Sequence, residues 1–460
     1  MRNSERAELL GIVGGLICAI VLVMVALFYA GKATDLVAFF VLTAVAPVIA
    51  AALIENRHVG ALAARYRRWH WPVNAALFTA VTIALVILSP YDAHLVLRST
   101  AIDYLVTVDR FVLWIALGAA YVFAAVMVGR WETRRETKWP RRLALVLALV
   151  FVVSLYDDGH HTEFMHYIPY MGPALYAAAG GVPFSDVYSQ YGLLPWVNIY
   201  AAFHVAPPGY GTAAIAVRLI HTIYLAIAVL VLYALARRPI SALMLMVPVL
   251  LVSISYHVGF VNLNAYPSAG GMRYLPPALM ALAAVRLPAR HWMTIAVLIL
   301  ASFWSLESFL FAGSIWGGTL FFERLRHRQL REAAMDVATG TAAVIGSHLA
   351  FALAIFAVTD RRIDYLPYFE MFGVFVDTRP IWMLPQSGAF LWWLPVWFCV
   401  FAVLTLAISS AIRGERNRLV PVAIWTIGAA AYFAGRTNST TLWMAAIPFG
   451  ILIICMLQDL

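Results

Sequence analysis

Continuous apolar runs of about 20 residues recur along this 460-residue chain and restrict what it can fold into. Such a run matches a helix crossing about 30 Å of hydrocarbon, and only helical bundles or closed barrels satisfy their backbone inside lipid. Barrel strands would alternate apolar and polar residues, whereas these runs are uninterrupted. With 63% hydrophobic and 12% charged residues, the chain is predicted to be an all-α, polytopic transmembrane helical bundle.

The apolar runs predict about 12 to 14 crossings. The candidate spans are residues 9–30, 34–54, 73–89, 111–129, 143–156, 193–206, 212–236, 240–255, 274–288, 293–322, 337–359, 388–411, 419–434 and 442–458. Segment 293–322 is long enough for two short helices with a kink between them. Segment 193–206 is short and contains Asn198 and His204, so we favour an interfacial or re-entrant placement over a full crossing.

Basic residues set the orientation, because short cytoplasmic loops of membrane proteins carry an excess of Lys and Arg. They concentrate within residues 57–68, 130–142, 324–331 and 413–418. This distribution accounts for the net charge of +9 without a nucleic-acid partner. An inner (plasma) membrane location is expected, with the stretch 156–192 on the periplasmic or extracellular face. An interfacial 193–206 also puts Arg237 and Arg238 on the cytoplasmic side.

The stretch 156–192 is unusual because it is acidic and rich in His and Tyr, and contains no Lys or Arg. Pro169 and Pro173 suggest short interfacial helices, and glycines near residue 180 suggest a turn. A carboxylate at a membrane interface can have a raised pKa and act as a general base. Solvated outer-loop acids are the plain alternative. Mg²⁺ or Mn²⁺ binding is left open, and no metal ligand is assigned, because adjacent histidines alone are a poor metal signature.

The stretch resembles the first large outer loop of GT-C superfamily glycosyltransferases, polytopic enzymes that take a sugar from a polyprenyl-phosphate carrier. The similarity rests on an acidic residue after a span, Asp157 or Asp158, and on a G-x-P-x-x-D-x-x-x-x-Y-G phrase at residues 181–192. Near the C-terminus, AYFAGRTNSTTLW is similar to a Gly-Arg-Ser/Thr phrase of bacterial members. WSLES (304–308) sits where such enzymes often keep a polar residue. The usual Asp-Glu pair is replaced by Asp-Asp here.

The resemblance implies an inverting membrane glycosyltransferase with a loop aspartate as base. Asp158 is the first candidate for the base and Asp157 the second, while Asp186 could position the acceptor, bind a metal or cap a turn. The candidate substrate-binding residues are His160, His161, Glu163, Gln190, Tyr191, Arg273, Glu307 and Arg436. The implied partners are a polyprenyl-phosphate sugar donor, a glycan, lipid or protein acceptor, and membrane lipid. Residues 1–142 would be N-terminal transmembrane helices, and 143–460 a GT-C-like core including outer loop 157–192.

A leaving phosphate needs cations, which an acidic loop does not supply. Arg273 and Arg436 rank above Arg361 and Arg362, because Asp360 and Asp364 are obvious ion-pair partners for those two arginines. Glu307 is either a site residue or the hydrated tip of a helical hairpin. Arg218 and His221 are expected to be interfacial.

Two other functions fit the sequence less well. A polysaccharide polymerase or ligase would also use lipid-linked sugars, but would depend more on Arg and His. A transporter would gather polar residues at the membrane midplane on broken helices, often in related halves.

Overall fold

The structure, a computed structural model, describes residues 108–134, 138–155, 164–255, 267–324, 327–377, 417–435 and 446–458, together with residues 404 and 408. The chain divides into two compact units, one of residues 1–103 and 381–445 and the other of 104–380 and 446–460. In the first unit the described residues form mainly α21 (Val420–Gly435), preceded by the short 3-10 helix η4 (Asn417–Leu419). The predicted domain boundary at residue 142 stays a prediction.

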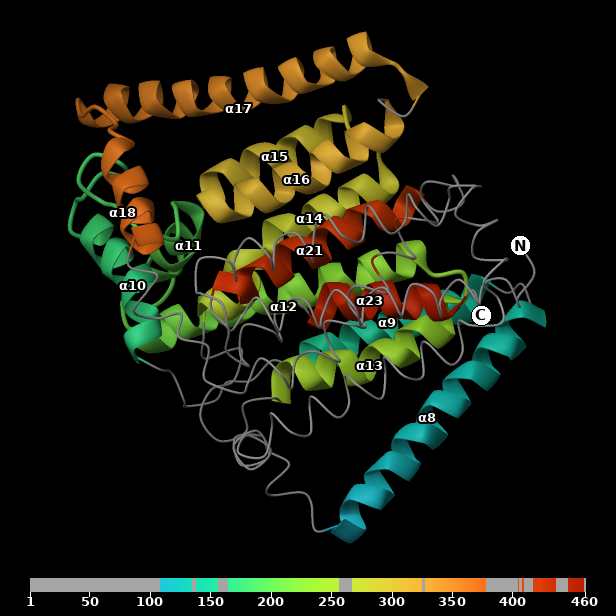
Figure 1. The fold of residues 1–460 in the computed structure, drawn as a ribbon. Coiled ribbons are helices and arrows are strands. Elements are labelled where there is room, and N and C mark those ends of the chain that lie inside the picture. The colour runs from blue at the N-terminus through green and yellow to red at the C-terminus, as the bar shows by residue number, and fades with distance from the viewer. Residues whose placement is uncertain are drawn as a thin grey trace, which may run out of the picture. The chain divides into compact units, whose positions relative to one another are not determined.

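The second unit is built from helices (Figure 1). In chain order they are α8 (Val108–Arg134), α9 (Lys138–Ser154), α10 (Phe164–Ala178), α11 (Leu194–Phe203), α12 (Tyr210–Leu235), α13 (Pro239–Ser255), η2 (Pro267–Ala269), α14 (Gly271–Arg286), α15 (Trp292–Trp304), α16 (Leu306–Glu323), α17 (Leu330–Thr359), α18 (Leu366–Asp377) and α23 (Ala446–Leu457). The described residues contain no strand, only an isolated bridge between Pro183 and Val187. The all-α prediction is confirmed for this part of the chain.

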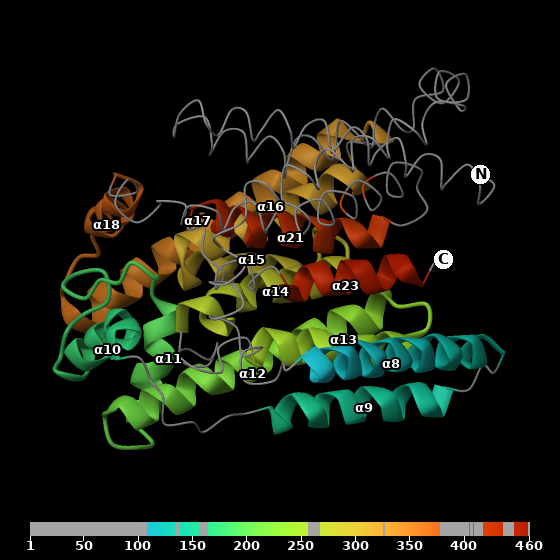
Figure 2. The same ribbon diagram turned by 60° about the horizontal axis from the view of Figure 1, so that its bottom comes forward.

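Helices α12 and α14 form the centre of the second unit. They pack closely on each other; α14 also packs on α15 and α16, and α13 packs on α8, α9 and α23. The fully buried side chains of Leu225, Leu232 and Met272 lie in this centre. Figure 2 shows the same long helices running alongside one another from a second direction.

Two described helices are long and apolar enough to cross a membrane, judged by length and composition. Of the most apolar 18-residue stretch of α12, 61% is buried within the protein, whereas in α17 none of the corresponding stretch is buried. The uncovered side chains of α17 include Leu349, Leu353 and Val358, which are 60%, 69% and 84% exposed. Contiguous apolar surface of this kind is rare on soluble monomers and marks contact with protein or lipid.

The described helices cover ten of the fourteen predicted spans, and most of their ends differ from the predicted ones by a few residues. Segment 293–322 divides into α15 and α16 at Ser305, whose extended backbone supplies the expected kink. Three predicted spans lie outside the residues that the structure describes: 9–30, 34–54 and 73–89. Of the predicted span 388–411, the structure describes only residues 404 and 408.

Helix α11 has 10 residues and is therefore about 15 Å long, half of what a crossing needs. This length fits the interfacial or re-entrant placement of 193–206. Helix α10 differs from the expected short pieces, because it continues through both Pro169 and Pro173. The buried side chains of Tyr167 and Tyr170 anchor it, and this packing offsets the backbone hydrogen bonds that the prolines remove.

Three chain segments meet at one end of the long helices. Glu132, only 2% exposed, accepts hydrogen bonds from the backbone N–H groups of Ile240 (3.1 Å) and Ser241 (3.4 Å) and pairs with Arg141.

The C-terminal helix α23 ends at the same place. Gln458 Oε1 accepts from the N–H groups of Arg237 and Arg238. We call this the basic end of the unit. The opposite end carries α10, α11 and α18, and we call it the loop end (Figure 1).

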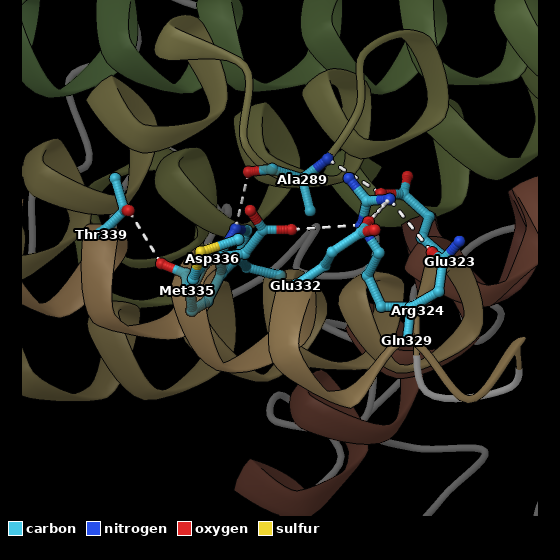
Figure 3. A network of polar contacts seen from close by, with 9 residues as sticks. Ala289, Glu323, Arg324, Gln329, Glu332, Met335, Asp336 and Thr339 are labelled. Carbon is cyan, nitrogen blue, oxygen red and sulfur yellow. Dashed lines mark hydrogen bonds and ion pairs between the residues drawn. The ribbon is translucent and has the colours of Figure 1, made fainter.

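A second polar network joins two turns at the basic end (Figure 3). Arg324 contacts Asp336 (3.2 Å) and Glu332 (2.6 Å) across the α16–α17 turn. Glu323 accepts a hydrogen bond from Ala289 N, and Trp316 Nε1 donates to Ala289 O. The α8–α9, α12–α13 and α16–α17 connections lie at the same end of the unit (Figure 1), and the side of a membrane that this end faces stays a prediction.

Candidate functional site

The phrase at residues 181–192 folds into a closed turn at the loop end. Asp186 Oδ1 accepts a hydrogen bond from Val182 N at 2.5 Å, and Asp186 Oδ2 pairs with Arg361. Gly181 allows the closure, because a Cβ there would lie 2.5 Å from the Val187 side chain. Both carboxylate oxygens of Asp186 have partners, and these contacts stabilise the turn. A catalytic role for Asp186 stays a prediction.

Gly192 brings this turn against the break between α15 and α16. Its φ is 81°, and a Cβ at this position would overlap the carbonyl oxygen of Trp304. The next residue, Leu193, donates its N–H to Phe303 O at 3.2 Å. Only glycine fits this approach, and it holds the preceding Tyr191 next to Ser305 and the first turn of α16.

Three predicted substrate-binding residues meet at this place: Tyr191, Arg273 and Glu307. Arg273 Nε lies 2.8 Å from Glu307 Oε2, and Arg273 Cζ lies 5.5 Å from the centroid of the Tyr191 ring. The Arg273 side chain is 7% exposed and that of Glu307 is 22% exposed. The site thus holds a nearly buried guanidinium next to an acid and the face of an aromatic ring, which attracts cations.

Backbone contacts fix the two helix starts that carry this pair. Ser305 Oγ caps α16 by accepting from Ser308 N (3.0 Å), and Ser308 Oγ donates to Arg273 O (2.7 Å). Trp304 Nε1 donates to Met272 O. These hydrogen bonds connect the start of α14 to the break between α15 and α16. They therefore fix the backbone positions of both Arg273 and Glu307.

The start of α14 also docks on α12. His221 Nδ1 accepts from Gly271 N at 3.2 Å, and a Cβ at Gly271 would lie 2.5 Å from Ile220 O. Arg218 and His221 are consequently buried, at 5% and 4% exposure. The covering of this face of α12 by α14 accounts for their burial, and their predicted interfacial depth in the membrane stays a prediction. The signals in the sequence were the adjacent glycines 270 and 271 and the i, i+3 spacing of two polar residues on an apolar helix.

Residues 360–368 contact the closed turn of residues 181–192, which we call the outer turn because it belongs to the predicted outer loop. Asp364 N donates to Phe184 O at 2.7 Å, and the Phe184 ring packs on Tyr365 and Tyr368 at 4.8 and 5.7 Å. Tyr368 OH in turn accepts from Leu306 N at 2.7 Å, which connects this segment to the first turn of α16.

Arg361 pairs with Asp186 and not with its expected neighbours. Asp364 Oδ1 accepts from Leu366 N and so caps α18, while Asp360 ends α17 with a φ of 54°. Both neighbouring acids occupy helix ends, and the arginine reaches the outer turn instead.

Burial raises the pKa values of three tyrosines in this region, Tyr188, Tyr365 and Tyr368. It raises the pKa of Tyr365 and that of Tyr368 to about 12. Burial also raises the pKa of Tyr188, with a further contribution from the charges of Asp364 and Asp186. These phenols stay protonated at neutral pH. The Tyr188 hydroxyl donates to Ser185 O at 3.0 Å, whereas that of Tyr368 accepts from Leu306 N.

The remaining site predictions are distributed as follows. Gln190 is partly exposed in the outer turn. Asp157, Asp158, His160, His161, Glu163 and Arg436 lie outside the described residues. Within the described part of the chain, no group of three or more His, Cys, Asp or Glu side chains is arranged to hold a metal ion. No family model matches the chain, and neither a curated protein nor a solved structure is similar to it.

Proposed function

We propose that this protein is a multi-pass membrane glycosyltransferase of the GT-C type, which moves a sugar from a polyprenyl-phosphate donor to an acceptor hydroxyl. The observation that carries the proposal is the buried guanidinium of Arg273 beside Tyr191 of the outer-loop phrase. A transferase of this kind needs a fixed cation next to that loop, and Arg273 is suited to bind the phosphate of the donor.

The membrane placement is supported by the surface of the helices. Apolar side chains of α9 such as Leu147, Val150 and Val153 are more than half exposed, as are those of α17. Arginines gather at the basic end, and the acidic phrase lies at the loop end. By the positive-inside rule, the basic end is cytoplasmic and the candidate site faces the periplasm or the cell exterior.

The proposed reaction is a direct displacement. Asp158, or Asp157 in its place, takes the proton of the acceptor hydroxyl while the acceptor oxygen bonds to the anomeric carbon. The bond from that carbon to the phosphate oxygen breaks, and polyprenyl phosphate leaves with the electron pair. Arg273 stabilises the developing negative charge, and Tyr191 orients the guanidinium. Glu307 neutralises Arg273 when no donor is bound.

The test uses the full chain in nanodiscs with a panel of polyprenyl-phosphate pentoses and hexoses. Wild-type protein should release polyprenyl phosphate from at least one donor in the presence of acceptor lipids or glycans. Asp158→Asn should abolish release while still binding the donor, because it removes a base and no phosphate contact. Release at the wild-type rate by this variant and by Asp157→Asn would contradict the proposal. Addition of EDTA tests the open question of a metal.

Transport is the second candidate function, and the buried pair Arg218 and His221 inside α12 is the observation that favours it. Ionisable residues that face the inside of a membrane helix bundle are typical of substrate pathways. A transporter would retain uptake in the Asp158→Asn variant and lose it in Arg218→Gln, the reverse of the pattern expected for the transferase.

A further inference from the structure

Tyr170 of α10 lies behind the Tyr191 ring in the candidate site. The two rings are stacked, with centroids 4.6 Å apart and planes inclined by 12°. Tyr170 is fully buried. Tyr191 in turn carries the Arg273 guanidinium over its ring. A continuous set of contacts therefore leads from α10 through Tyr191 to the cation of the site.

A second connection fixes Tyr191 to the same helix. Ser189 Oγ donates to Pro169 O at 2.9 Å and accepts from Tyr191 N at 3.2 Å. Pro169 directly precedes Tyr170, so the backbone and the ring of Tyr191 are both held at one point of α10. Gly192 then fixes the following peptide against Trp304.

We propose that Tyr170 is a positioning residue for anion binding: it holds the Tyr191 ring, and thereby the Arg273 guanidinium, in the orientation that receives a lipid phosphate. This inference rests on the proposed function for the identity of the anion. Tyr170 does not touch the anion itself. A cation over a ring is attracted by the negative face of the ring, and the attraction weakens when the ring turns. Rotation of Tyr191 would remove the ring face from beneath the Arg273 guanidinium.

The chain offers matched variants. Tyr170→Leu removes the stacked ring, and Tyr170→Phe keeps it. Tyr167→Leu is the control for a buried ring lost from the same helix, because Tyr167 is also fully buried but packs edge-on against Tyr210, with centroids 6.3 Å apart. A merely structural role for Tyr170 predicts similar effects of the two leucine variants.

The first measurement is binding of polyprenyl phosphate in nanodiscs of otherwise zwitterionic lipid. Tyr170→Leu should weaken binding about tenfold, and Tyr170→Phe and Tyr167→Leu by less than about threefold. In an Arg273→Gln background, Tyr170→Leu should cause no further loss, because its effect passes through the guanidinium. Wild-type affinity in Tyr170→Leu, or an equal loss in the Arg273→Gln background, would overturn the inference.

The second measurement separates this inference from the proposed function. Unfolding temperatures of the single and double variants at Tyr170 and Arg273 form a double-mutant cycle that needs no ligand. The shifts should be non-additive in the wild-type background and additive once Tyr191 is changed to Leu. If wild-type protein binds no polyprenyl phosphate but the cycle is non-additive, the proposed function fails and the positioning role stands. Additive shifts in the wild-type background refute the positioning role.

Discussion

The Glu307 carboxylate lies 2.8 Å from Nε of the nearly buried Arg273, and the two residues come from the first turns of different helices. Removing one partner of a buried ion pair leaves a charge without compensation. The Glu307→Gln substitution should therefore lower the free energy of unfolding by about 2–4 kcal/mol, since Glu307 is partly exposed. It should also tighten polyprenyl-phosphate binding several-fold, because the internal anion that competes for Arg273 is gone.

Thermal unfolding and nanodisc binding measure these two effects of Glu307→Gln. Glu370→Gln is the control, because Glu370 is exposed on α18. Weaker phosphate binding in Glu307→Gln would assign Glu307 to donor binding and contradict its role as a resident counter-ion.

Gly192→Ala should be severely destabilising. The φ of 81° disfavours any side chain, and the added Cβ would overlap the Trp304 carbonyl. A loss of about 3 kcal/mol or more in the free energy of unfolding is expected, measured by thermal unfolding in detergent. Gly346→Ala on α17, where a Cβ meets nothing within 4 Å, should be neutral or stabilising by about 0.5–1 kcal/mol. Equal stability of the two variants would show that the turn does not adopt this conformation.

Asp186 and Arg361 should respond unequally to neutralisation. The side chains of this ion pair are 49% (Arg361) and 29% (Asp186) exposed, so Arg361→Gln should cost less than about 1 kcal/mol. Asp186→Asn weakens the acceptor of Val182 N as well and should cost about 1 kcal/mol more. Thermal unfolding and donor turnover together separate the structural role of Asp186 from the catalytic one. Complete loss of turnover in Asp186→Asn at full stability would assign it to catalysis.

Stability should fall at alkaline pH because of two phenols, the half-buried Tyr365 and the buried Tyr368. The pKa values of Tyr365 and Tyr368 are raised to about 12 in the folded protein, above an unfolded value of about 10. Their contribution is therefore fully present below about pH 10 and is lost as the pH rises toward about 12. Unfolding temperatures measured across this window should fall less steeply in the double Phe variant than in wild type. Tyr176→Phe, on the exposed face of α10, should leave the slope unchanged.

The approximate helix positions and the break near residue 305 follow from local pattern. Uninterrupted apolar runs with polar or Gly/Pro boundaries set the helices, because backbone hydrogen bonding within a helix needs no distant residue. The same holds for the turn at 181–192, in which Gly, Pro and Asp act on their own neighbours. Arg237 and Arg238 were also placed at the basic end from charge distribution and the short length of 193–206.

Contacts between distant segments could not be predicted from the sequence. No local signal pairs Arg273 with Glu307 or Arg361 with Asp186, because each pair forms only after helices far apart in the chain have packed. The burial of Arg218 and His221 was missed for the same reason, since it depends on α14 approaching α12 through Gly270 and Gly271. The sequence alone determined most of the helical segments of the described residues, although not α18 within the predicted loop 360–386, and it determined which connections are basic. The tertiary structure alone decided which charges face each other, because a side chain's partner depends on helix rotation and packing distance, which hydrophobic periodicity leaves undefined.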